Sequence, residues 1–154
     1  MSADVGSKAP DFTLSNQDKQ PVTLSAQAGK TVVLAFFPAA FTSVCQKELC
    51  HFRDQLAAFN SVNATVFGIS VDTPFTLKEF ARQNSLNFDL LSDFNKDAIT
   101  KYDVSNPDML GLKGISRRAV FVIDGGGVIR HRQVTASPGD EPDYQQIHAA
   151  LAAL

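Results

Sequence analysis

The feature that most constrains the fold is a continuous apolar run at residues 31–37, TVVLAFF, rich in valine and phenylalanine. A strand with one wet face alternates apolar and polar residues, whereas an uninterrupted run of this length is typical of a strand buried on both faces. Such a strand needs cover on both sides of its sheet. The run therefore predicts a central strand of an α/β fold, not a surface hairpin.

Strand and helix patterns alternate along the rest of the chain. Residues 43–60 carry apolar side chains at spacings of three and four, which predicts an amphipathic helix. Asp72, Thr73 and Pro74 are typical of a helix start. The other expected elements are strands at residues 64–71, 87–91, 118–124 and 128–134, the last two joined at Gly125–Gly127, with helices at 97–102 and 143–154.

The first 30 residues predict a short hairpin, in which Phe12 and Leu14, then Val22 and Leu24, alternate with polar residues around a turn at 16–19. We expect this hairpin to be an appendage to the main sheet. The whole order predicts a single thioredoxin-like domain over residues 1–154. Its fold class is α/β, with a central mixed sheet, mostly parallel, flanked by helices on both faces.

Charge and hydropathy exclude several classes of function. The chain has 14 Lys and Arg against 16 Asp and Glu, a formal charge of −2, so neither a nucleic-acid partner nor a membrane surface is expected. The most apolar stretch, residues 32–41, is interrupted by Pro38 and is shorter than the roughly 20 residues of a spanning helix. The start of the chain lacks the pattern of a secretory signal, so a cytoplasmic location is expected.

The two cysteines, Cys45 and Cys50, are the candidates for chemistry. Cys45 falls in the first turn of the helix expected at residues 43–60, where unpaired N–H groups and the helix dipole stabilise an anion. Since the thiolate is the reactive form of cysteine, this position suits a nucleophile. Cys45 also continues the apolar stripe of Leu49 and Phe52, so taken alone it is better explained as a small core residue than as a nucleophile.

Two spaced motifs change that balance. Pro38, Thr42 and Cys45 form PxxxTxxC, and Arg118 lies three residues before the Phe of FVID at 121–124. With APDFTL at 9–14 and LLSD at 90–93, they make nearly the whole chain resemble the peroxiredoxin family.

The resemblance implies a role for each residue of the site. Cys45 would attack the peroxide, and Thr42 and Arg118 would bond the thiolate and the peroxide oxygens. Pro38 would shield the site, and Glu48, at CxxE, would brace the arginine. Arg117 is the neighbouring rival of Arg118, but consecutive strand residues point to opposite faces, so one of the two faces the site. The resemblance implies no metal and no organic cofactor.

The role of Cys50 depends on which branch of the family the chain follows. The segment FFPAAFTSVCQKEL is similar to the alkyl hydroperoxide reductase E type, whereas the CxxxxC spacing is similar to peroxiredoxin Q, in which the second cysteine resolves the first. Residues five apart in an intact helix have Cα atoms about 8.7 Å apart. A disulfide tolerates at most about 7 Å. A Cys45–Cys50 bridge therefore requires the helix to open.

The sequence thus predicts a thiol peroxidase for hydrogen peroxide and organic hydroperoxides, recycled through a Cys45–Cys50 disulfide by thioredoxin or a similar dithiol, as a monomer or homodimer. One alternative is a one-cysteine peroxidase in which Cys50 is not the resolver. Another is a non-enzymatic redox-sensing or metal-binding module using Cys45, Cys50 and His51, a poor tetrahedral set. A thioredoxin-like disulfide reductase would require a CxxC pair, and a glutathione-peroxidase-like enzyme would normally use a tryptophan beside its nucleophile. The chain has neither feature, which argues against both enzyme classes.

Overall fold

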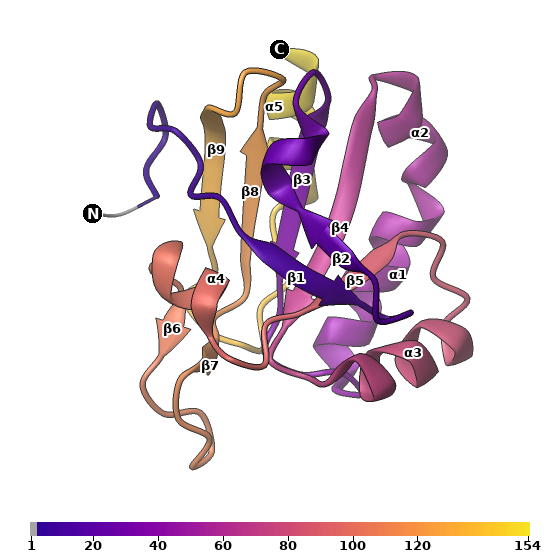
Figure 1. Cartoon of the computed structure of the whole chain (residues 1–154), viewed down its shortest axis with the longest axis vertical. Helices are drawn as coiled ribbons and strands as arrows, with labels where there is room; N and C mark the ends of the chain where they lie inside the picture. Colours follow the sequence, from indigo (N-terminus) through magenta and orange to yellow (C-terminus); the bar gives the residue numbers. More distant parts are fainter. Residues whose placement is uncertain (1–2) are drawn as a thin grey trace.

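The computed structural model describes residues 3–154. Within them, seven strands form one sheet in the order β2-β1-β5-β4-β3-β8-β9 (Figure 1). The strands are β1 (Thr13–Asn16), β2 (Pro21–Thr23), β3 (Thr31–Phe36), β4 (Ala64–Ser70), β5 (Asp89–Ser92), β8 (Ala119–Ile123) and β9 (Ile129–Val134), with β6 (Ser105–Asn106) and β7 (Ile115–Ser116) paired separately. The helices are α1 (Ser43–Asp54), α2 (Leu56–Ser61), α3 (Pro74–Gln83), α4 (Asp97–Lys101) and α5 (Tyr144–Ala152), with a 3₁₀ turn at Leu24–Gln27.

Strand β3 has the buried interior position that its apolar run predicts. It pairs in parallel with β4 and antiparallel with β8. Its even-numbered side chains, Val32, Leu34 and Phe36, enter one core cluster. Val33 and Ala35 enter the other, together with Phe37, which directly follows the strand. The absence of polar residues from positions 32–37 is therefore explained by two buried faces.

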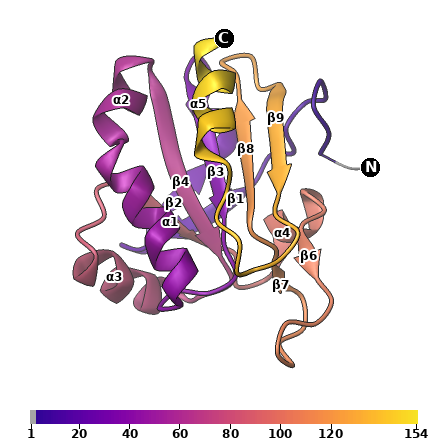
Figure 2. The ribbon, with the colours of Figure 1, turned by 180° about the vertical axis from the view of Figure 1, so that it is seen from behind.

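Helices cover the two faces of the sheet unequally (Figures 1 and 2). Residues of α1, α2, α3 and α5 pack in the cluster that contains Phe37, whereas α4 packs with the N-terminal segment in the cluster that contains Phe36. On the α4 side, Tyr102 is fully buried and donates its hydroxyl hydrogen bond to the Pro10 carbonyl at 2.6 Å. Among the described residues, no helix combines the length and the hydropathy needed to cross a bilayer.

Three sequence expectations about the fold are wrong. The N-terminal hairpin is not an appendage, because β1 pairs antiparallel with β5 and extends the main sheet. The sheet is not mostly parallel: β3–β4 and β4–β5 are its parallel pairs, and the other described neighbours are antiparallel. The helix expected at 43–60 is broken at Gln55, whose φ of −97° and ψ of 4° are not helical. Its apolar stripe nevertheless continues, since Phe52 and Phe59 are buried in one cluster.

The register of β3 on β8 decides where the chemistry-bearing residues meet. Phe36, the last residue of β3, lies opposite Ala119, the first residue of β8. The segment that leaves β3 toward α1 and the segment that enters β8 are therefore side by side, at the lower edge of the sheet in Figure 1. This register brings Arg118 next to a helix start more than 70 positions earlier in the sequence.

Candidate active site

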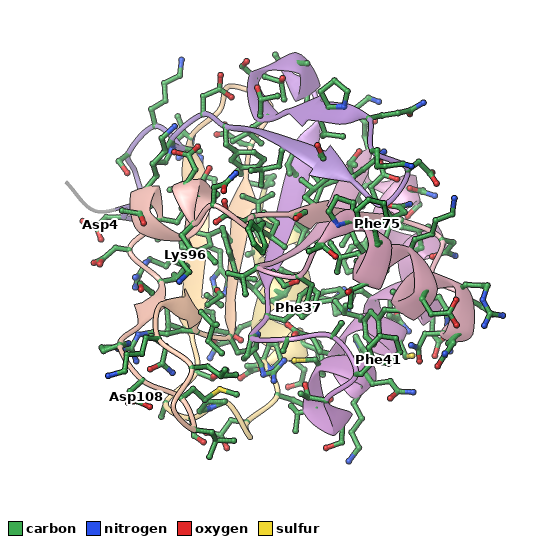
Figure 3. All side chains as sticks on the ribbon, turned by 60° about the horizontal axis from the view of Figure 1, so that its bottom comes forward. Asp4, Phe37, Phe41, Phe75, Lys96 and Asp108 are labelled. Carbon is green, nitrogen blue, oxygen red and sulfur yellow. The ribbon has the colours of Figure 1, made fainter. Side chains whose placement is uncertain are left out.

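Cys45 is fully buried in the first turn of α1. The N-cap of the helix is Thr42, with the extended backbone (φ −94°, ψ 147°) that precedes a helix, and Cys45 is 0% exposed. Its side chain packs in the same cluster as Leu49 and Phe37. Figure 3 views this end of the sheet, with Phe37 and Phe41 on the segment that joins β3 to α1. The sulfur therefore has both the core environment and the helix-start position that the sequence predicts.

Arg118 is the cation beside this sulfur. Its Nη2 donates to Cys45 Sγ at 3.2 Å and its Nη1 donates to Glu48 Oε1 at 2.8 Å, while the side chain is only 2% exposed. Arg117 is exposed and donates instead to the Ser105 carbonyl at 3.1 Å. Of the two adjacent arginines, the structure brings Arg118 to Cys45.

A backbone carbonyl completes the surroundings of the guanidinium. Pro138, in the segment between β9 and α5, accepts from Arg118 Nη2 at 2.8 Å and from Nε at 3.2 Å. The planar group is thus fixed by a carboxylate, a carbonyl and the sulfur together. Sequence reasoning missed Pro138 because an accepting carbonyl has no residue-type signature; its position follows from the path of the chain after β9.

Glu48 is a buried carboxylate with an incomplete set of partners. Its Oε1 accepts from Arg118, but its Oε2 has no hydrogen-bond partner among the described residues, and the side chain is 0% exposed. Burial raises the pKa of Glu48 to about 7, against the opposing charge and hydrogen bond of Arg118. For Arg118, burial disfavours the cation, yet the charges of Glu48 and Cys45 leave its pKa raised. The arginine stays charged, and the carboxyl group titrates near neutral pH.

The loop before α1 holds the other two expected site residues. Pro38 is buried, and Thr42 is exposed. The Thr42 hydroxyl donates to the Ala39 carbonyl at 2.9 Å, and within the described chain it makes no hydrogen bond to Cys45. The contact expected between Thr42 and the sulfur is therefore absent from this conformation, because the hydroxyl is satisfied inside its own turn.

The same loop is tied to the sheet by residues that sequence reasoning did not identify. Asp72 Oδ2 accepts from the Ala40 N–H at 2.8 Å and from the Ser70 hydroxyl at 2.7 Å. Phe41 has a φ of 67°, unusual for a residue with a side chain, and its ring packs edge-on against Phe80 of α3 at 5.2 Å between centroids. The aromatic contact and the aspartate anchor hold the loop in a strained form.

Cys50 lies on the same helix, five residues after Cys45. It is half-buried, and its Sγ donates to Asn84 Oδ1 at 3.7 Å. Both cysteines are free thiols, and α1 runs without interruption through both positions. Since an intact helix separates them by about 8.7 Å between Cα atoms, a disulfide requires α1 to unwind.

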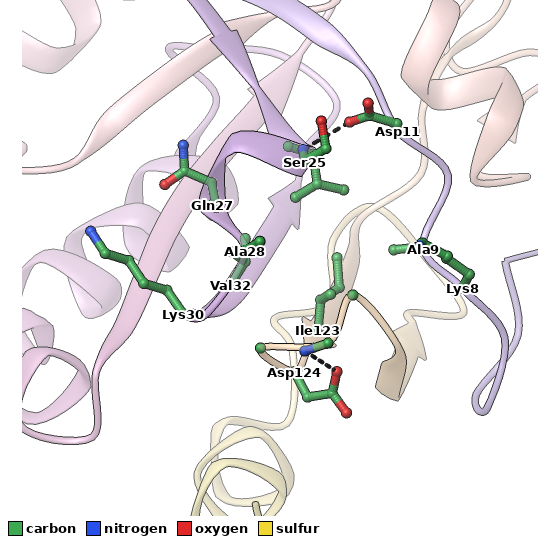
Figure 4. A pocket seen from close by; sticks show the side chains of 14 residues that line it. Lys8, Ala9, Asp11, Ser25, Gln27, Ala28, Lys30, Val32, Ile123 and Asp124 are labelled. Atoms are coloured by element: carbon green, nitrogen blue, oxygen red, sulfur yellow. Dashed lines mark hydrogen bonds between the residues drawn. The ribbon is translucent and has the colours of Figure 1, made fainter.

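A separate cavity lies away from this site. It has a volume of about 320 Å³ and is lined by residues such as Lys30 and Val32 at the start of β3 and Ile123 at the end of β8 (Figure 4). Cys45 follows the opposite end of β3, so this cavity does not contain the site. Among the described residues no group of three or more His, Cys, Asp or Glu side chains could hold a metal. In particular, the His51 ring stacks on Tyr144, and Cys50 contacts Asn84, so these residues are engaged separately.

The titration of Glu48 predicts a pH effect on stability. Its ordinary pKa of 4.5 is raised to about 7 on folding, so over this interval the folded protein holds a proton that the unfolded chain has released. Increasing pH from about 5 to about 8 should therefore lower the free energy of unfolding through Glu48, and Glu48→Gln should lose less stability than the parent. Urea denaturation at both pH values measures this difference.

Glu79→Gln provides the matched control for that experiment. Hydrogen bonds from Arg82 and Gln83 lower the pKa of the partly exposed Glu79 to about 2, so this carboxylate does not titrate between about 5 and 8. Its removal should leave the pH dependence of the parent unchanged. Equal losses of stability in the parent and Glu48→Gln proteins would contradict the assignment.

Comparison with known proteins agrees with this geometry. The profile of the AhpC/TSA family matches residues 5–132. The chain is 43% identical over 153 residues to alkyl hydroperoxide reductase E of Mycobacterium tuberculosis, covering 97% of each chain. It is also 39% identical over 125 residues to chloroplastic peroxiredoxin Q of Sedum lineare, covering 81% of this chain and 66% of the relative.

Solved structures give the same result at the level of the fold. The crystal structure of peroxidoxin BcpB from Mycobacterium tuberculosis superposes with a TM-score of 0.86 at 32% identity, covering 97% of each chain. A peroxiredoxin-like protein from Aquifex aeolicus superposes with a TM-score of 0.90 at 27% identity, covering 99% of this chain and 88% of the other. The expectation of a thioredoxin-like fold of the peroxiredoxin type is confirmed, and the chain belongs to the AhpC/TSA family of peroxiredoxins.

Proposed function

We propose that this chain is a single-domain thiol peroxidase in which the Cys45 thiolate attacks the outer oxygen of a hydroperoxide. The observation that carries the proposal is the 3.2 Å contact between Arg118 and a cysteine at a helix start. A sulfur–oxygen bond forms as the oxygen–oxygen bond breaks. The sulfur loses two electrons and becomes a sulfenic acid. The other oxygen of the peroxide leaves as an alkoxide or hydroxide, which takes a proton from solvent.

Arg118 has two electrostatic roles in this step. Its fixed positive charge stabilises the thiolate before the reaction. As the oxygen–oxygen bond breaks, negative charge moves onto the leaving oxygen, and a guanidinium already oriented by Glu48 and Pro138 can stabilise it without reorganisation. Glu48 acts here through Arg118 and is a positioning residue.

Substrate access requires a small movement of the loop at residues 38–42. Cys45 is fully buried and Pro38 covers the strand end, so a peroxide reaches the sulfur when this loop shifts. The Thr42 hydroxyl then exchanges the Ala39 carbonyl for a peroxide oxygen, since one rotation about its side chain frees the donor. The half-exposed Phe41 ring offers an apolar contact for the body of an organic hydroperoxide.

Cys50 completes the cycle by condensing with the sulfenic acid. A sulfur–sulfur bond forms and the sulfur–oxygen bond breaks. The hydroxyl group of the sulfenic acid leaves as water after taking the proton of the Cys50 thiol. Thioredoxin or a similar dithiol of the cytoplasm then reduces the disulfide by thiol exchange. Because both thiols belong to one chain, the cycle operates equally in a monomer and in each subunit of a homodimer.

Replacing the nucleophile should abolish the reaction. In Cys45→Ser the sulfur that accepts the oxygen is missing, so peroxide consumption should fall to the rate without protein. The measurement is the stopped-flow disappearance of hydrogen peroxide and of an organic hydroperoxide with the reduced protein. Consumption by Cys45→Ser at the parent rate would show that another group reacts.

Adjacent arginines provide a matched pair of variants. Arg118→Lys keeps a positive charge but loses the planar fork, so we expect the second-order rate constant with peroxide to fall by about a hundredfold or more. Arg117→Lys alters an exposed residue and should change it by less than about twofold. Circular dichroism checks the fold of both. A rate loss in Arg117→Lys equal to that in Arg118→Lys would reject the assignment.

Removal of Cys50 separates two-cysteine from one-cysteine catalysis. Cys50→Ser should react once with peroxide, stop at a sulfenic acid, and proceed to sulfinic acid when peroxide is in excess. Intact mass spectrometry shows these oxygen additions, whereas the parent should lose two hydrogens. Unchanged turnover with thioredoxin in Cys50→Ser would instead establish a one-cysteine cycle.

A further inference from the structure

Cys50 is held in the folded helix by contacts that the peroxidase reaction itself does not use. Its Sγ donates to Asn84 Oδ1 at 3.7 Å, across the interface between α1 and the end of α3. Asn84 is the C-cap of α3 and is only 7% exposed. A buried polar side chain of this kind needs partners, and Cys50 supplies the one for its oxygen.

The orientation of the Asn84 amide is fixed by its other bonds. Its Nδ2 donates to the Phe80 carbonyl at 2.9 Å, so its Oδ1 must face α1. The backbone carbonyl of Asn84 accepts from Arg53 Nη1 at 2.6 Å. One residue at the end of α3 therefore holds α1 at two points, Cys50 and Arg53.

The contacts of Asn84 differ from the Arg118–Cys45 contact at the first turn of α1 in their dependence on the redox state of Cys45. Attack on peroxide converts the Cys45 thiolate into a neutral sulfenic acid, so the attraction between the sulfur and Arg118 weakens at that moment. The bonds from Cys50 and Arg53 to Asn84 do not depend on the redox state of Cys45. After the first step, they remain to oppose the unwinding of α1.

We propose that Asn84 is a positioning residue that, with Arg53, retains Cys50 on the folded helix and so sets the rate at which the resolving thiol reaches oxidised Cys45. This inference rests on the proposed resolving role of Cys50. Its chemical consequence is a competition for the sulfenic acid. In one branch Cys50 forms the disulfide and releases water; in the other a second hydroperoxide transfers its oxygen, giving sulfinic acid and an alcohol or water.

The test removes the Asn84 side chain. Asn84→Ala loses the acceptor for Cys50 but keeps the backbone carbonyl for Arg53, and the φ of −101° suits alanine. Loss of one such bond should speed disulfide formation roughly two- to tenfold. At a fixed excess of peroxide, the sulfinic fraction should fall accordingly, while the rate of the first oxidation stays at the parent value. Reduced protein is mixed with hydrogen peroxide and quenched in acid at intervals. Intact mass spectrometry then measures the disulfide and sulfinic fractions.

Two further variants separate positioning from general weakening of α3. Thr73→Ala removes the N-cap bond to the Thr76 N–H at the far end of α3 and leaves the Asn84 contacts in place. It should form the disulfide at the parent rate. Arg53→Gln removes the second contact independently and should accelerate disulfide formation, which keeps the proposal testable should Asn84→Ala not fold.

The outcomes distinguish this inference from the function on which it rests. A parent protein that consumes peroxide but never forms the disulfide would reject the resolving role of Cys50, and this inference with it. A parent that forms the disulfide at the same rate as both Asn84→Ala and Arg53→Gln would reject the inference alone. Equal acceleration in Thr73→Ala and Asn84→Ala would also reject it, since the overall stability of α3 would then be the cause.

Discussion

The buried cation of Arg118 is the constraint on which the site depends. Isolating a guanidinium from water costs several kcal/mol unless its hydrogen bonds and charge are matched. Cys45 and Glu48 of α1 and the Pro138 carbonyl after β9 supply that match from two separate parts of the chain. Arg118 meets α1 because the end of β3 lies opposite the start of β8. The fold thus brings the cation to the sulfur, and the cation in turn requires an anionic or polarisable partner at that point.

The same packing that places Cys45 beside Arg118 also restricts its chemistry. A fully buried sulfur at a helix start has a fixed position relative to Arg118, which favours a defined attack geometry. It cannot meet Cys50 while α1 is intact. Efficient attack and efficient resolution therefore require two different conformations of one helix, and the contacts around Asn84 and Arg53 determine the balance between them.

Much of this arrangement could be predicted from the sequence, because local rules govern it. The run at residues 31–37, the Thr73–Pro74 helix start and the glycine turn at 125–127 each have a short-range physical cause. What could not be predicted depends on long-range pairing: β1 joining β5, the Pro138 carbonyl reaching Arg118, and Asp72 anchoring the loop at Ala40. The residues around Thr42 in the sequence could not show whether its hydroxyl donates to the Cys45 sulfur or to the Ala39 carbonyl.

The break at Gln55 gives the conformational change a natural limit. Helix formation and melting are cooperative along continuous hydrogen-bonded segments. A single helix over residues 43–60 would link the opening of its first turns to the packing of Phe59, which is a buried residue of α2. Because Gln55 interrupts the helix, α2 has its own start and its own contacts with the sheet. We therefore expect α1 to unwind around Cys45 and Cys50 while the core beneath α2 stays packed, which makes a reversible disulfide compatible with a stable fold.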